Sequence, residues 1–148
     1  MMIEARRLGR LLWFGALLAP LAAAAHGGPG RDGMGEPGRM FDPDTVTTVQ
    51  GRISHIQRID RGRGHRGIHV TLAVGSEALP VHLGPDFYVD GQGLKLAEGD
   101  VVEVKGSRVT FQGEPAIIAQ ELRRGADVLA LRDADGVPLW RGHGGGRR

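Results

Sequence analysis

The stretch that decides the fold is "GIHVTLAVGSEALPVHLGPDFY", Gly67 to Tyr88. Apolar residues alternate on both sides of Gly75-Ser76, a pair with glycine first that suits a two-residue type II′ turn. In the register of such a hairpin, Ile68 lies opposite Leu83 at the open end. The alternation then predicts one buried face, made of Ile68, Val70, Leu72, Leu79, Val81 and Leu83.

Two histidines of this stretch, His69 and His82, fall on the opposite phase. The same register sets them face to face on the outer side of the hairpin, with Cβ atoms about 4.5–5.5 Å apart. Two imidazoles at that spacing can share a copper or zinc ion if a third ligand joins them. The alternative is a pair of solvated polar residues on a wet strand. Candidate third ligands come from neighbouring segments: His55, His65, Asp60, Asp86 and Asp90.

The first 25 residues read as a targeting signal. Three arginines in "MMIEARRLGR" precede the apolar run "LLWFGALLAPLAAAA", which ends in small residues that fit a signal-peptidase site. We therefore expect export to the periplasm, cleavage near residue 25, and no transmembrane segment in the mature chain. Removal of residues 1–25 leaves equal numbers of basic and acidic residues, so net charge does not favour nucleic-acid binding.

A new N-terminus would make His26 a further metal candidate. Cleavage after Ala25 would join its α-amine and imidazole in one chelating residue, whereas cleavage after Ala23 would place it third in the chain. Residues 26–43 are rich in Gly and Pro, and we expect a disordered linker there. The folded domain should span residues 44–141, followed by a flexible basic tail at 142–148.

Throughout the domain, turn residues such as Gly, Pro and Asp separate short apolar segments, as in β-proteins. Strands are expected at 46–59, 68–74, 78–83, 101–111 and 116–122, with a third hairpin over "DVLALRDADGVPLW" and one short helical turn near Asp86. Many short strands and one brief helix predict an all-β fold, a small OB-like β-barrel of six to seven strands. Its core should include Val70, Leu72, Val81, Leu83, Val102 and Val104.

A basic loop, "RIDRGRGHRG", is the second feature with possible chemistry. Its arginines are Arg58, Arg61, Arg63 and Arg66. The first loop of an OB barrel often contacts oligonucleotides or oligosaccharides, so this loop is a candidate anion site. Single-strand binders also need aromatic stacking platforms, and the outward positions of the hairpin carry none, which disfavours nucleic acid.

Catalysis has little support in the sequence. It contains no Gly-x-Ser-x-Gly motif and no P-loop, and the carboxylates Asp133 and Asp135 are explained by a turn. The absence of cysteine excludes disulfides, thiolate metal sites and covalent c-type haem. We expect a protein that is not an enzyme.

The fragments "VTTVQGRISHI", "VHLGPDFYV", "LAEGDVVEVKGSRVTF", "PAIIAQEL" and "LRDADGVPLW" resemble small exported bacterial β-barrel proteins, in particular the domain of the magnetosome proteins MamS and MamX. More distantly they are similar to exported OB-fold proteins, some of them labelled DNA-binding. The resemblance covers residues 44–141. It implies an accessory domain of the cell envelope connected with metal or redox handling.

Three functions follow from these features. The preferred one is an exported, non-enzymatic accessory module that holds a transition metal through surface histidines. The second is an OB-type binder of oligonucleotides or oligosaccharides through the arginine loop at 58–66. The third is a domain that binds another envelope protein and no small ligand.

Overall fold

The computed structural model describes residues 37–62 and 64–142. The expected signal peptide at 1–25, most of the expected linker and all but the first residue of the expected tail lie outside these ranges. The end of the linker differs from expectation, because Pro37–Met40 forms a 3-10 helix that packs against the barrel. No helix within these ranges has the length and apolar character that crossing a bilayer requires.

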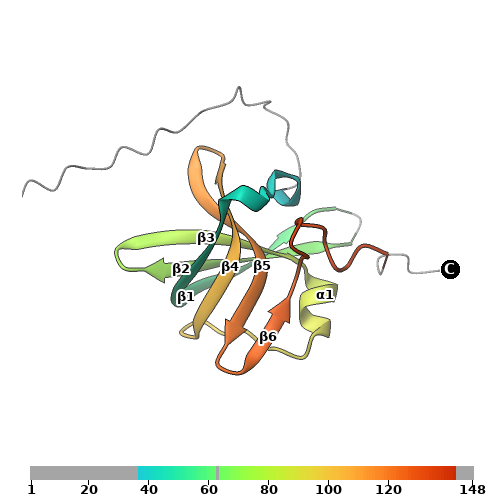
Figure 1. Ribbon diagram of the computed structural model, residues 1–148. Coiled ribbons are helices and arrows are strands. Elements are labelled where there is room, and N and C mark those ends of the chain that lie inside the picture. Colours follow the sequence, from blue (N-terminus) through green and yellow to red (C-terminus); the bar gives the residue numbers. More distant parts are fainter. Residues whose placement is uncertain (1–36, 63, 143–148) are drawn as a thin grey trace, which may run out of the picture. The chain divides into compact units, whose positions relative to one another are not determined.

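The described chain begins with two 3-10 turns and continues as six strands and one α-helix (Figure 1). The elements are η1 (Pro37–Met40), η2 (Pro43–Thr45), β1 (Val46–Asp60), β2 (Arg66–Val74), β3 (Glu77–Pro85), α1 (Asp86–Gly91), β4 (Val101–Phe111), β5 (Glu114–Arg124) and β6 (Asp127–Ala130).

The first five strands close into a barrel. The hydrogen-bonded order is β3-β2-β1-β4-β5-β6, and a parallel pairing of β3 with β5 joins the two sides. A meander of three strands, a helical connection and a hairpin that returns to the first strand give the OB-like barrel expected from the sequence. Strand β6 extends the sheet beyond β5 (Figure 1).

The hairpin of β2 and β3 follows the predicted register along most of its length. His69 lies opposite His82, and Val70 opposite Val81. Gly75 has φ +59° while Ser76 is not left-handed, as a type II′ turn requires. The predicted pair of Ile68 with Leu83 is wrong, because a bulge between Ile68 and His69 shifts the partner of Ile68 to Gly84.

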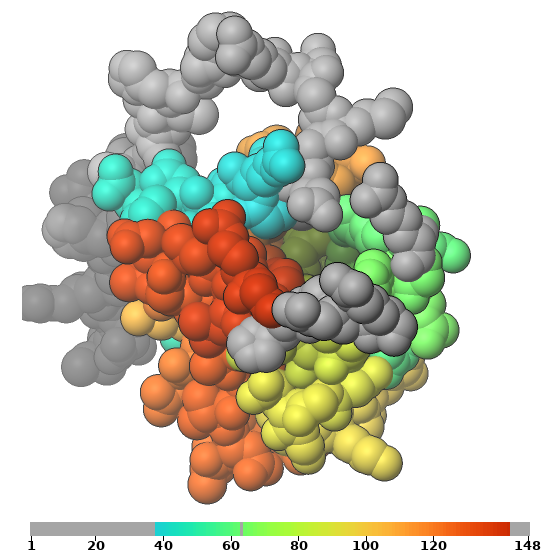
Figure 2. All heavy atoms as spheres, turned by 90° about the vertical axis from the view of Figure 1, so that its right-hand side faces the viewer, coloured from blue at the N-terminus to red at the C-terminus, as the bar shows by residue number. Residues whose placement is uncertain are grey.

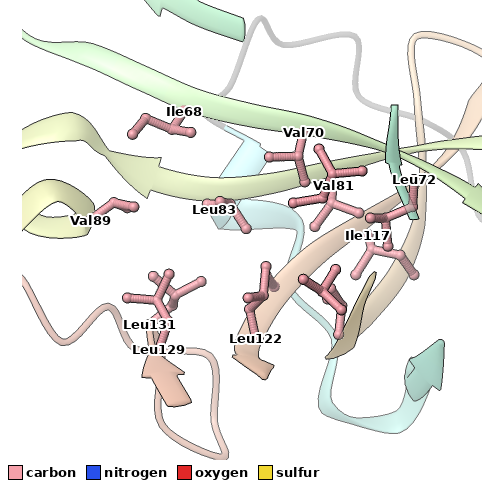
Figure 3. Close-up of a cluster of buried hydrophobic side chains, with 14 of the residues drawn as sticks. Ile68, Val70, Leu72, Val81, Leu83, Val89, Ile117, Leu122, Leu129 and Leu131 are labelled. Atoms are coloured by element: carbon pink, nitrogen blue, oxygen red, sulfur yellow. The ribbon is translucent and has the colours of Figure 1, made fainter. Parts of the chain in front are cut away.

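The barrel interior contains buried apolar residues from all six strands. Figure 3 shows part of this cluster, mainly from β2, β3 and β5. All six residues predicted for the core are buried, with 2% exposure or less: Val70, Leu72, Val81, Leu83, Val102 and Val104. Two glycines permit close backbone approaches. A Cβ on Gly51 would lie 2.7 Å from the carbonyl oxygen of Ala73, and one on Gly106 would lie 2.9 Å from Cα of Ala119.

The chain after β6 departs from the predicted third hairpin. The expected turn at Asp133–Gly136 forms, since Gly136 donates to the carbonyl of Asp133. The two arms are joined by an isolated β-bridge between Arg132 and Pro138 and by hydrogen bonds from Asp133 N to Val137 O and from Leu139 N to Leu131 O, but they form no regular strand pair. The segment instead folds against β3, where ring atoms of Trp140 approach a Cβ built on Gly84 to 2.7 Å. We call residues 131–142 the C-terminal segment.

Candidate ligand-binding site

A cavity of about 560 Å³ lies on the outer side of β2 and β3. Its walls come from the loop between β1 and β2, from the chain around η1, and from the C-terminal segment. In Figure 2 these walls appear as the green, cyan and red parts of the surface. We call it the His–Arg cavity because His69, His82, Arg61 and Arg132 all line it.

The two histidines of the hairpin meet inside this cavity. Nδ1 of His82 lies 3.0 Å from Nε2 of His69, and the ring centroids are 4.1 Å apart. Nη2 of Arg61 lies 3.1 Å from the same Nε2 of His69. The prediction that the hairpin register brings these two histidines together is therefore confirmed.

The arginine contact determines the protonation of the pair. A guanidinium has only donors, so Nε2 of His69 must accept the hydrogen bond from Arg61. The single lone pair of this nitrogen is then shared between Arg61 and Nδ1–H of His82, because a second lone pair at 3.0 Å would repel it. Neutral His82 consequently carries its lone pair on Nε2, a buried atom with no hydrogen-bond partner among the described residues. This leaves a buried acceptor that makes no hydrogen bond within the described residues.

Both rings are held neutral by their surroundings. Burial, with the charge of Arg61 added, lowers the pKa of His69 from 6.5 to about 4. Burial, followed by the effects of His69, Arg61 and Arg132, lowers the pKa of His82 to about 3. Neither imidazole ring is therefore positively charged at neutral pH.

The expectation that both histidines are exposed is wrong for His82, whose exposed fraction is 5%. Its ring packs edge-on against Phe111, with 5.0 Å between centroids. The C-terminal segment also covers this face of β3. The outward phase was thus predicted correctly, but the outward side of β3 is not a wet surface.

The other metal candidates do not join the pair. His55 binds Glu98, with Nδ1 3.1 Å from Oε1, and lines no part of the cavity. His65 lines the cavity but packs against Phe87, 5.6 Å between ring centroids. His26 lies outside the described residues. Within residues 37–62 and 64–142 there is no group of three or more His, Asp or Glu side chains placed to hold a metal ion.

The arginines of the basic loop have separate roles. Arg58 makes two hydrogen bonds to Asp90, at 2.9 and 3.0 Å, and faces away from the cavity. Arg66 lines the cavity while its Nε donates to Asp86 at 3.1 Å. Arg61 holds His69, and Arg63 lies outside the described residues. Two of the four candidates therefore tie the loop to α1.

Arg132 was not found from the sequence and is the central charge of the site. It is 6% exposed, and its Nη1 donates to the carbonyls of Leu83, at 3.0 Å, and of Ala119. Its guanidinium lies 4.8 Å from the ring centroid of Trp140. No carboxylate pairs with it in the described part of the chain, and its Nε has no partner there.

A buried charge without a counterion is unfavourable. Burial lowers the pKa of Arg132 only to about 10, so the group stays charged at neutral pH. The cavity is lined by five arginines and a single carboxylate, that of Asp135; the arginines are Arg39, Arg61, Arg66, Arg132 and Arg141. The electrostatic environment therefore favours an anion over a cation.

Fold and site together define an OB-like barrel with a positively charged cavity on the outer face of its second and third strands. The chain belongs to the MamS/MamX magnetosome protein family, whose model matches residues 45–129, more than half of the sequence. No curated protein matches the chain.

Similar solved structures include several OB-type proteins. The N-terminal domain of PriB from Thermoanaerobacter tencongensis is 14% identical, with 57% of this chain and 99% of that chain covered and a TM-score of 0.46. The Stn1–Ten1 complex of S. pombe is 24% identical, with 55% of this chain and 59% of that chain covered and a TM-score of 0.44. The mitochondrial single-stranded DNA binding protein Rim1 of S. cerevisiae is 11% identical, with 61% of this chain and 96% of that chain covered and a TM-score of 0.43.

Proposed function

We propose that this protein is an exported, non-enzymatic binding module of the cell envelope, and that the His–Arg cavity binds an anionic ligand. The single observation that carries this proposal is the lining of the cavity, with five arginines and one carboxylate. The cavity lies where OB barrels commonly bind their ligands, beside strands 2 and 3 and the loop between strands 1 and 2. Its volume of about 560 Å³ is in the range typical of small-molecule sites.

The histidine pair supports binding rather than proton transfer. General acid–base catalysis works best with a pKa near the working pH. The pKa values of His69 and His82, lowered to about 4 and about 3, are far from neutrality. These rings are therefore suited to hydrogen bonding with a fixed polarity.

The experiment uses Trp140 as a reporter, since it lines the cavity and the chain has one other tryptophan, Trp13. Exported protein, from which cleavage near residue 25 would remove Trp13, would be titrated with glucuronate at low salt while Trp140 fluorescence is recorded. We expect a saturable change that Arg61→Ala weakens severalfold. The matched control is Arg108→Ala, an exposed arginine on β4 outside the cavity. Equal weakening by both variants, or no response to glucuronate, would refute an anion site.

A transition metal is the second candidate, because one distance favours it. Two nitrogens that share a tetrahedral ion with bonds of about 2.0–2.1 Å lie roughly 3.3 Å apart, and those of His69 and His82 are 3.0 Å apart, so an ion could replace their hydrogen bond once the ring hydrogen of His82 moves to Nε2. The guanidinium of Arg61 opposes a cation there. If a metal binds, Arg61→Ala should strengthen Zn(II) or Cu(II) binding in calorimetry and His69→Ala should abolish it.

A further inference from the structure

The arginines that line the His–Arg cavity come from three separate segments of the chain. They belong to η1 (Arg39), to the two ends of the loop between β1 and β2 (Arg61 and Arg66) and to the C-terminal segment (Arg132 and Arg141). Positive charge therefore lies in more than one wall of the cavity. An occupant with charges on several of its groups can meet more of these walls than a single anionic group can.

The protein itself neutralises few of these charges. Within the described ranges only Arg66 of this set forms an ion pair, with Asp86, and one carboxylate, that of Asp135, lines the cavity. Five arginine charges, less one for Asp86 and one for Asp135, leave a net charge of +3. His69 and His82 add no charge at neutral pH, because burial lowers their pKa values to about 4 and about 3.

We infer that the ligand of the His–Arg cavity is a compact polyanion, with about three negative charges on separate carboxylate or phosphate groups that complement the charge of the walls. This inference rests on the proposed function and names its ligand class. Guanidinium groups bind carboxylates and phosphates alike through paired N–H donors, so the two chemistries are recognised in the same way. A ligand with a single charge would leave most of the positive charge in the walls without a counterion.

The size of the cavity and the state of its aromatic rings favour a small molecule over a nucleic-acid strand. The volume of about 560 Å³ is in the range of small-molecule sites. Trp140 packs on Gly84, and its ring centroid lies 4.8 Å from the guanidinium carbon of Arg132. Phe41 packs on Gly136 in the same manner. Neither ring is therefore a free stacking platform for bases.

The test is a charge series on one propane backbone, since butyrate, glutarate and tricarballylate carry one, two and three carboxylates. In calorimetric titrations of the exported protein at pH 7.5 and low salt, affinity should rise at least about fivefold with each added charge, the attraction of one further ion pair at about 4 Å in water. Added NaCl should weaken tricarballylate more than butyrate, because salt screens exposed charges. Pyrophosphate, which also has about three charges at this pH, shows whether phosphate or carboxylate is the better source.

Two exposed arginines offer a variant that should keep the fold, Arg39 and Arg141. Arg39→Gln combined with Arg141→Gln lowers the net charge of the cavity from +3 to +1. The preference for tricarballylate over butyrate should then fall by at least about tenfold. The matched control, Arg108→Gln with Arg123→Gln, removes the same charge from exposed arginines outside the cavity and should keep the preference.

The outcomes separate this inference from the proposed function. Equal affinity across the series, with glucuronate still bound, would overturn the inference and leave an anion site standing. An equal loss of preference in the double variant and in its control would overturn it too, as would tighter binding of oligothymidylate than of tricarballylate or pyrophosphate. If no carboxylate, glucuronate included, and no pyrophosphate binds at low salt, both the inference and the proposed function fail.

Discussion

Acid should destabilise this protein through the buried histidine pair. In the unfolded chain each histidine has a pKa near 6.5 and takes up a proton as the pH falls through that value. In the folded protein the pKa is lowered to about 4 for His69 and about 3 for His82. The unfolded state therefore binds more protons below pH 6.5, and the free energy of unfolding falls with pH until the folded values are reached.

The magnitude between pH 7.5 and pH 5.0 depends mainly on the unfolded value. Both folded rings remain neutral at pH 5.0, while the unfolded rings are almost fully protonated. Each histidine should then remove about 2 kcal/mol of stability across this interval, and the pair about 4 kcal/mol. Burial is the main cause that keeps the pair neutral in this range, and Arg132, with a pKa of about 10, stays charged throughout it.

The assay is urea unfolding at a series of pH values. The double variant His69→Gln with His82→Phe should have a pH profile that is flatter by about 4 kcal/mol, because contributions from other groups cancel in the difference. The control is Phe111→Leu, which loosens the packing around His82 and keeps both histidines, so that a loss of stability alone can be told from a change in the pH profile. A double variant as acid-sensitive as the wild type would refute the burial argument.

Three further predictions concern the core, the contact between β4 and β5, and cleavage of the signal peptide. Leu83→Ala should lower the free energy of unfolding in urea by about 2–4 kcal/mol, while Val101→Ala, at a position 46% exposed, should change it little; equal effects would contradict the hairpin phase. Gly106→Ala should lower the free energy of unfolding by about 1–3 kcal/mol in the same assay, since its Cβ would lie 2.8 Å from Cγ2 of Ile117; wild-type stability would mean that β4 and β5 shift enough to accommodate the methyl group. Intact mass of exported protein should place the N-terminus at Ala25 or His26, and a full-length chain in the membrane fraction would rule out cleavage.

The barrel could be predicted from the sequence because its signals are local. Alternation around Gly75-Ser76 determined the face and most of the register of the hairpin, and β4 has the predicted bounds of Val101 to Phe111. The bulge beside Ile68 could not be predicted from local signals, because its partner Gly84 packs under Trp140. Trp140 lies 56 residues further along the sequence and reaches Gly84 only in the folded chain.

The site was only partly predictable, for the same physical reason. The facing of His69 and His82 follows from strand periodicity within one hairpin. The burial of His82 depends on Phe111 and on the C-terminal segment, which no local pattern places against β3. Arg132 follows Leu131 on the outward phase of its segment, and such an arginine normally indicates a solvated position. Its burial arises only because that segment folds against β3 and β5.

The family match separates the barrel from part of the cavity wall. The family match ends at residue 129, whereas Arg132, Trp140 and the chain around η1 lie outside it. A relative that shares only the matched region would keep the barrel and the facing strands, but it would lack this wall and the charge of Arg132. If the proposed anion site exists, its buried charge is therefore supplied by a segment outside the matched region, while the matched region supplies most of the barrel.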